Sequence, residues 1–105
     1  MDSQVWVVKP ASARAHKEWE KAKQKEPGLM AKEKERLVNR PLERGDNPTR
    51  THKLRGPLAT RAIDGVKFDQ WQHELTSEGR IWYCVDRKKR IIWVTKVSLS
   101  HPNET

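Results

Sequence analysis

Two side chains near the C-terminal end of the chain, Arg80 and His101, are suited to chemistry on a phosphate group. Arg80 begins the segment Arg-Ile-Trp-Tyr after a Ser-Glu-Gly turn, and His101 follows a second apolar run. A guanidinium can donate two parallel hydrogen bonds to phosphate oxygens, and an imidazole can take up or release a proton near neutral pH. Such groups are often held at the ends of elements in a rigid scaffold. This combination makes RNA chemistry the first hypothesis for the chain.

The overall charge favours a polyanionic partner. Lys and Arg total 22 against 14 Asp and Glu, and the formal net charge is +8. Nucleic acid or a ribosome surface would fit this charge, and an acidic protein would fit it equally well. With 105 residues, 34% of them hydrophobic, we expect one domain, residues 1–105, with a thin core.

Several kinds of site have no support in the sequence. The single cysteine, Cys84, excludes an intramolecular disulfide and a cysteine-only metal site, and the four histidines lack ligand spacing. No Walker-type loop or dinucleotide fingerprint is present, so we expect no cofactor and no metal. No apolar run approaches the ~20 residues of a membrane span, and no signal-peptide core begins the chain, which predicts a cytoplasmic protein.

Periodicity and turn signals predict the elements that must position these side chains. We expect strands over residues 5–8, 66–75, 80–85 and 91–97, and helices over residues 13–25 and 29–40. Ser12 is a suitable N-cap for the first helix, and Pro41 stops the second. The order β-α-α-β-β-β predicts an α+β fold in which a helical hairpin packs on a small, mainly antiparallel twisted sheet.

Further expectations concern the middle of the chain and the packing. Residues 44–65 are rich in Gly, Pro and basic side chains, which predicts a basic connection without regular structure apart from a short extended piece over residues 53–55. A shift of the apolar phase between Phe68 and Trp71 predicts a β-bulge. The five tryptophans and Cys84 fall in apolar phases, so we expect them in the core, with an inert thiol.

The C-terminal half carries motifs similar to those of a known family. Residues 53–56 read Lys-Leu-Arg-Gly, residues 74–85 read Glu-Leu-Thr-Ser-Glu-Gly-Arg-Ile-Trp-Tyr-Cys-Val, and the chain ends in His-Pro-Asn-Glu-Thr. Together with the β-α-α-β-β-β order, this resembles the RelE/ParE superfamily of small bacterial toxins over nearly the whole chain. The resemblance implies a toxin of a type II toxin–antitoxin pair. The RelE-like branch cuts mRNA in the ribosomal A site without a metal, whereas the ParE-like branch inhibits DNA gyrase and has lost the nuclease residues.

The resemblance also implies roles for individual residues. Arg80 matches the strand arginine that contacts the scissile phosphate, and an ion pair with a carboxylate such as Glu78 is the alternative. His101 matches a C-terminal histidine that acts as acid or base, and an exposed tail is the alternative. His73 and Glu74 lie where many relatives carry Lys or Arg, and either is a candidate catalytic group. Because adjacent strand residues point to opposite faces, at most one of them faces the site.

Basic residues in the middle of the chain are candidates for contacts with phosphates. Lys53, Arg55 and Arg61 would contact RNA or ribosomal phosphates, and His52 lies near a position where some branches carry a carboxylate base. A solvated loop is the alternative for each of them. We therefore expect mRNA in the ribosomal A site, ribosomal RNA and a cognate antitoxin as partners. A ParE-like gyrase inhibitor without catalysis and a non-toxic RNA- or protein-binding relative are the alternative functions.

Overall fold

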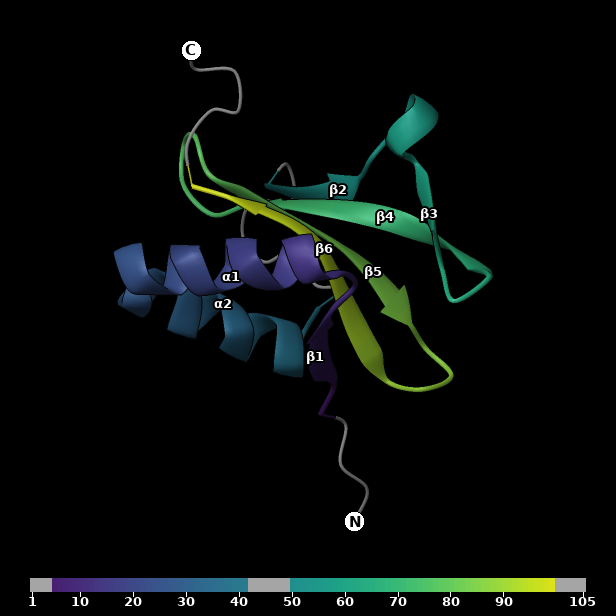
Figure 1. Ribbon diagram of the computed structural model, residues 1–105, viewed down its shortest axis with the longest axis horizontal. Coiled ribbons are helices and arrows are strands. Elements are labelled where there is room, and N and C mark those ends of the chain that lie inside the picture. The colour runs from purple at the N-terminus through teal and green to yellow at the C-terminus, as the bar shows by residue number, and fades with distance from the viewer. Residues whose placement is uncertain (1–4, 42–49, 100–105) are drawn as a thin grey trace.

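Two helices lie against one face of a six-stranded sheet (Figure 1). The computed structural model describes residues 5–41 and 50–99. In chain order the elements are β1 (Val7–Pro10), α1 (Ala13–Lys25), α2 (Pro27–Asn39), β2 (Thr51–Lys53), the 3-10 helix η2 (Gly56–Leu58), β3 (Thr60–Ile63), β4 (Val66–Glu74), β5 (Arg80–Asp86) and β6 (Ile91–Ser98). The expected α+β class is confirmed, but the described residues form six strands where the sequence predicted four.

Both helices begin at residues that favour a helix start. α1 has the predicted bounds because the Ser12 hydroxyl accepts a hydrogen bond from the Ala15 amide at 3.1 Å, which caps the first turn. α2 begins at Pro27, earlier than predicted, because a proline without an amide hydrogen fits the first helical position. Neither of these two described helices is long and apolar enough to cross a membrane.

The sheet is mixed, with one parallel pair at its edge. The strand order is β1-β6-β5-β4-β2, and β3 also pairs with β4. β1 runs parallel to β6, whereas the other pairs are antiparallel. β1 covers Val7–Pro10 and not residues 5–8, because an edge strand can include a proline whose missing N–H faces away from the ladder.

The prediction of an irregular connection over residues 44–65 is wrong for its second part. β2 pairs with residues 71–73 of β4, and β3 forms a hairpin with residues 66–69 of the same strand. The hairpin turns at Asp64 and Gly65, both of which have positive φ angles. Such short, polar strands leave little local signal because their stability comes from pairing with β4. Residues 44–49 lie outside the described residues.

The core lies between the sheet and the two helices. We call the helix-covered side of the sheet its inner face and the opposite side its outer face. The core consists of Trp6, Ala22, Met30, Leu37, Leu75, Ile81, Tyr83, Ile92, Val94 and Val97. Cys84 is fully buried as expected, and burial raises the pKa of its thiol to about 11, which keeps it protonated.

The expectation of five core tryptophans is confirmed for Trp6 and wrong for Trp82 and Trp93, whereas Trp19 and Trp71 are partly buried and pack against the core. Trp6 is 8% exposed, but four others keep more of their surface accessible: Trp19, Trp71, Trp82 and Trp93. Strand alternation explains two of these, since Trp82 and Trp93 project from the outer face, which neither α1 nor α2 covers.

The irregularity in strand pairing lies between β5 and β6 and not at residues 68–71. Trp82 pairs with Lys96 but the next residue, Tyr83, pairs with Val94, so Thr95 is the extra residue of a bulge. As a result, Val94 and Val97 both reach the core, although three positions separate them. The bulge therefore keeps the polar residues beyond it on the outer face.

Candidate functional site

Strand alternation decides which side chains share the outer face. Along β5, Ile81 and Tyr83 enter the core, so Arg80 and Trp82 point to the opposite side. The register with the neighbouring strands extends this alternation into two polar rows across the sheet. One row is Glu74–Arg80–Ser98 and the next is His52–Gln72–Trp82–Lys96. We call these seven residues the outer-face site.

Arg80 lies in the centre of the first row, on the first residue of β5. Its Nε is buried and has no hydrogen-bond partner within residues 5–41 and 50–99. Neither Glu74, directly opposite on β4, nor Glu78 in the preceding turn forms a salt bridge with it in this described part of the chain. A buried donor without a partner is costly, and a bound anion would satisfy it.

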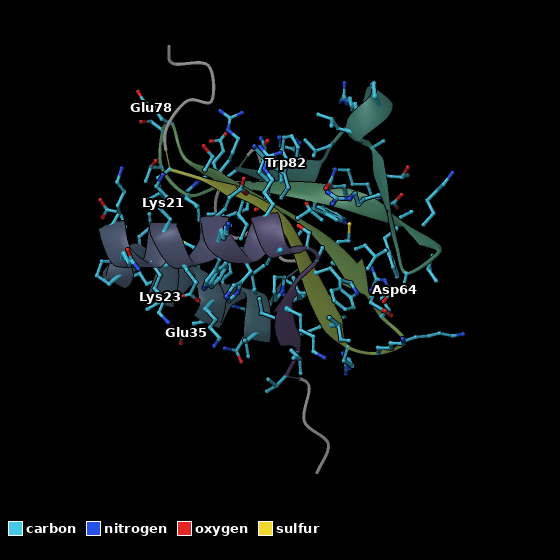
Figure 2. All side chains as sticks on the ribbon, viewed as in Figure 1. Lys21, Lys23, Glu35, Asp64, Glu78 and Trp82 are labelled. Atoms are coloured by element: carbon cyan, nitrogen blue, oxygen red, sulfur yellow. The ribbon has the colours of Figure 1, made fainter. Side chains whose placement is uncertain are left out.

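The second row holds an aromatic ring in a fixed orientation. The Trp82 Nε1–H donates to Gln72 Oε1 at 2.8 Å, and Gln72 is itself only 8% exposed. On the other side, the Lys96 ammonium lies 5.7 Å from the centre of the Trp82 ring. Figure 2 shows Trp82 on the side of the sheet that faces away from α1. The row thus combines a ring, an amide and a cation.

His73 and Glu74 point to opposite faces, as strand geometry requires. His73 faces inward, where its Nδ1 lies 2.7 Å from the Thr51 hydroxyl and its Nε2 lies 3.5 Å from Glu33. Burial, reinforced by the charges of Arg36 and Arg50, lowers the pKa of His73 to about 3. The ring is therefore neutral at physiological pH and separated from Arg80 by the sheet.

The surroundings of His73 form a polar cluster that the sequence did not reveal. Arg36 donates two hydrogen bonds to Glu33, at 2.8 and 3.1 Å, and a third to the Tyr83 hydroxyl at 3.4 Å. The Tyr83 hydroxyl in turn donates to the Pro41 carbonyl at 2.8 Å. We call Glu33, Arg36, Thr51, His73 and Tyr83 the inner cluster. Glu33 sits in a run of alternating charges, and its spacing to Arg36 was the only local sign of pairing.

The charges of the inner cluster stabilise one another against the cost of burial. Burial raises the pKa of Glu33, and the paired guanidinium of Arg36 offsets part of this effect. For Arg36 burial acts against the charge, but the Glu33 carboxylate outweighs it and raises the pKa. Burial also raises the pKa of the Tyr83 hydroxyl. These groups are suited to holding α2 on the sheet, and each of them has at least one partner, although the Nη1 of Arg36 is buried without one.

The remaining candidates do not form one patch. His52 belongs to the outer-face site, and its Nδ1 lies 3.1 Å from the Lys53 carbonyl. Lys53 forms a salt bridge with Asp69 at 3.2 Å, which neutralises its charge locally. Arg55 is exposed after β2, and Arg61 is partly buried on β3. His101 lies outside the described residues.

The outer-face site is therefore where the structure brings predicted residues together. It unites Arg80 with Glu74, with His52 in the next row, and it excludes His73. Within residues 5–41 and 50–99, no three His, Cys, Asp or Glu side chains gather closely enough to hold a metal ion. Compared with known proteins, the sequence matches no family model and no curated protein.

Proposed function

We propose that this chain is a RelE/ParE-like toxin of a type II toxin–antitoxin pair that cuts mRNA on the ribosome without a metal. The observation that carries the proposal is the Arg80 guanidinium, whose buried Nε has no partner within the described residues. It lies on the sheet face opposite the two helices, beside a cation and an aromatic ring, in a chain of net charge +8. Arg80 also lies within residues 74–85, the segment whose sequence resembles the family.

Metal-free cleavage of RNA requires three groups, and the outer-face site supplies candidates for two of them. As the 2′-oxygen bonds to phosphorus, negative charge develops on the phosphate oxygens, and the Arg80 guanidinium would stabilise this charge. Glu74, the carboxylate opposite Arg80, would remove the 2′-hydroxyl proton. As the bond between phosphorus and the 5′-oxygen breaks, that oxygen takes a proton, and His101 is the candidate donor.

The sheet alone would be a weak catalyst if the RNA were not oriented. In-line attack needs the 2′-oxygen, phosphorus and 5′-oxygen held in one line, which the ribosomal A site would provide. Exposed cations such as Arg55 would add contacts to phosphates that position the protein without reading sequence. A cognate antitoxin with an acidic segment would suit the same basic surface.

The first test is primer extension on a defined mRNA in a reconstituted translation reaction, with and without ribosomes. We expect ribosome-dependent cuts by the wild type and a loss of about 10²–10³-fold in rate with Arg80→Ala. Arg14→Ala is the matched control, because it removes the same charge from an exposed helical position where Arg14 pairs with Glu18 at 3.3 Å. Equal cutting by the Arg80→Ala and Arg14→Ala proteins would contradict the proposal.

A second candidate, a non-catalytic relative that acts by binding, is favoured by the inward position of His73. Within the described residues, the only candidate base directly opposite Arg80 is Glu74. Glu74→Gln keeps the size and hydrogen-bonding capacity of this side chain but removes the carboxylate. If growth inhibition persists in Glu74→Gln and no mRNA is cut, binding is the mode of action. A supercoiling assay with purified gyrase then separates a ParE-like inhibitor from an RNA- or protein-binding relative.

A further inference from the structure

We propose that Trp82 is a stacking platform for one base of a single-stranded RNA, and that Lys96 and Arg80 contact the adjoining phosphates. This inference rests on the proposed function and adds a base-binding subsite to it. A stacked aromatic ring binds any base through its π-face, so the subsite would provide affinity and placement rather than sequence recognition.

The Trp82 ring is already held in place. Its Nε1–H is bonded to Gln72 Oε1 at 2.8 Å, and Gln72 is 8% exposed, so the amide that orients the ring is fixed by its own surroundings. The ring itself is only partly buried. Because the side chain is ordered before binding, little further rotational freedom is lost when a base stacks on it.

The position of Trp82 relative to Arg80 suits a nucleotide. The two residues are separated by one position on β5 and share the outer face, which places their Cα atoms about 6.8 Å apart along the strand. A base stacked on Trp82 therefore places its sugar and phosphate within the span of the long Arg80 side chain. Within residues 5–41 and 50–99 the Arg80 side chain forms no salt bridge, so no carboxylate competes with the phosphate for its guanidinium.

Lys96 supplies the second phosphate contact. Its ammonium lies 5.7 Å from the centre of the Trp82 ring, and no carboxylate of residues 5–41 and 50–99 forms a salt bridge with it. A cation–π contact at an accessible site is weak, so the ammonium can leave the ring for a phosphate when a base arrives. The ring face that Lys96 now covers is then free for stacking.

The inner side of the sheet contains a matched pair without these properties. The Lys53 ammonium also lies 5.7 Å from a tryptophan ring, that of Trp71. However, Lys53 is paired with Asp69 at 3.2 Å, and Trp71 packs against the core. The comparison isolates what makes Trp82 different, namely a neighbouring cation without a carboxylate and an adjacent unpartnered arginine.

The test uses an RNA that cannot be cut, so that binding is measured without catalysis. A short 2′-O-methyl oligonucleotide containing 2-aminopurine, whose fluorescence falls on stacking, is titrated with the full-length protein. We expect quenching by the wild type, and a loss of quenching with about tenfold weaker binding for Trp82→Leu. Trp82→Phe should keep most of the quenching because a ring remains, and Trp71→Leu should match the wild type. Thermal unfolding of each variant verifies that it is folded.

The role of Lys96 has a separate readout in the salt dependence. Each phosphate contact to a single strand contributes about 0.7 to the slope of log affinity against log salt concentration. Lys96→Gln should lower this slope by about 0.7, whereas Lys23→Gln, on the helical side in Figure 2, should leave it unchanged. An equal slope for both variants would remove Lys96 from the subsite.

The outcomes distinguish this inference from the proposed function. Absence of ribosome-dependent cuts with quenching that depends on Trp82 would overturn the nuclease and leave the stacking subsite standing. If Arg80→Ala abolishes the cuts but the wild type and Trp82→Leu quench equally, the nuclease would stand and the stacking subsite would be overturned. Absence of any quenching by the wild type at millimolar protein would overturn the subsite outright.

Discussion

On the inner face of the sheet, Arg36 is bonded to Glu33 and Tyr83 and leaves its Nη1 without a partner, whereas on the outer face Arg80 forms no salt bridge in the described chain and its Nε is buried without a partner. His73, one position before Glu74, belongs to the first environment, and Glu74 belongs to the second. The same residue type thus occurs on both faces of one sheet in different environments. A paired buried charge holds the fold together, while a partly exposed arginine without a salt bridge is available to a ligand. The type of a side chain alone does not decide between these roles.

The largest expected effect is on the inner face. Arg36→Ala leaves the Glu33 carboxylate, which is 3% exposed, without its bidentate partner. Loss of one member of a buried pair should lower the free energy of unfolding by about 3–5 kcal/mol. Urea unfolding followed by circular dichroism measures the change. In the double variant Glu33→Gln/Arg36→Ala the uncompensated charge is gone, so part of the loss should return. Stability unchanged in Arg36→Ala would show that the inner cluster does not hold α2.

The second-largest expected effect is a decrease in folding stability at low pH that His73 causes. The unfolded chain takes up a proton as the pH falls through about 6.5, whereas the folded ring stays neutral down to about pH 3. The stability contributed by the neutral ring is therefore complete above pH 6.5 and is lost as the pH falls towards 3. The loss should be about 2 kcal/mol between about pH 6.5 and about pH 5, at about 1.4 kcal/mol per pH unit.

His73→Asn provides the control for this pH dependence. Its amide can still bond the Thr51 hydroxyl but does not titrate, so the unfolding free energy of this variant should vary less over the same pH range. Glu33, whose pKa is raised by burial, acts in the opposite direction just above pH 4.5 in both proteins. Identical pH profiles for the wild type and His73→Asn would mean that His73 is charged in the folded state.

The smallest effect is expected on the outer face. Arg80→Met removes a buried donor that lacks a partner and keeps most of the apolar length of the side chain. The free energy of unfolding should stay the same or rise by up to about 1 kcal/mol, as measured in the same urea experiment. RNA binding and cleavage should be lost at the same time. A loss of stability as large as that of Arg36→Ala would make Arg80 a structural residue and remove the contrast between the faces.

Local signals predicted an element correctly where a single residue determines its start or where its apolar pattern is regular. Ser12 determined the start of α1, and the apolar pattern of residues 80–97 identified β5 and β6. Long-range pairing was not predictable in this way. β2 and β3 have polar sequences, and they exist because β4 offers them a partner. Pro10 and Pro27 lie inside elements because the edge of a sheet and the first turn of a helix accept a proline.

The candidate site was predictable in part. Alternation along the strand already required His73 and Glu74 to face opposite ways, but it could not say which side would be covered by helices. That choice depends on packing, and it separated His73 from Arg80. The burial of Glu33 could not be recognised among its charged neighbours. Trp82 was expected in the core because its apolar character does not reveal that it lies on the sheet face opposite the helices.

The pairing of β1 with β6 constrains how this protein is made. Synthesis delivers β1 and both helices first, long before the strand that completes the sheet beneath them. Met30 and Leu37 then have no sheet to pack on, and the apolar sides of the helices stay accessible on the nascent chain. A message interrupted before the codon for residue 91 would therefore yield an aggregation-prone fragment, and the helices would find their full packing surface only after β6 has left the ribosome.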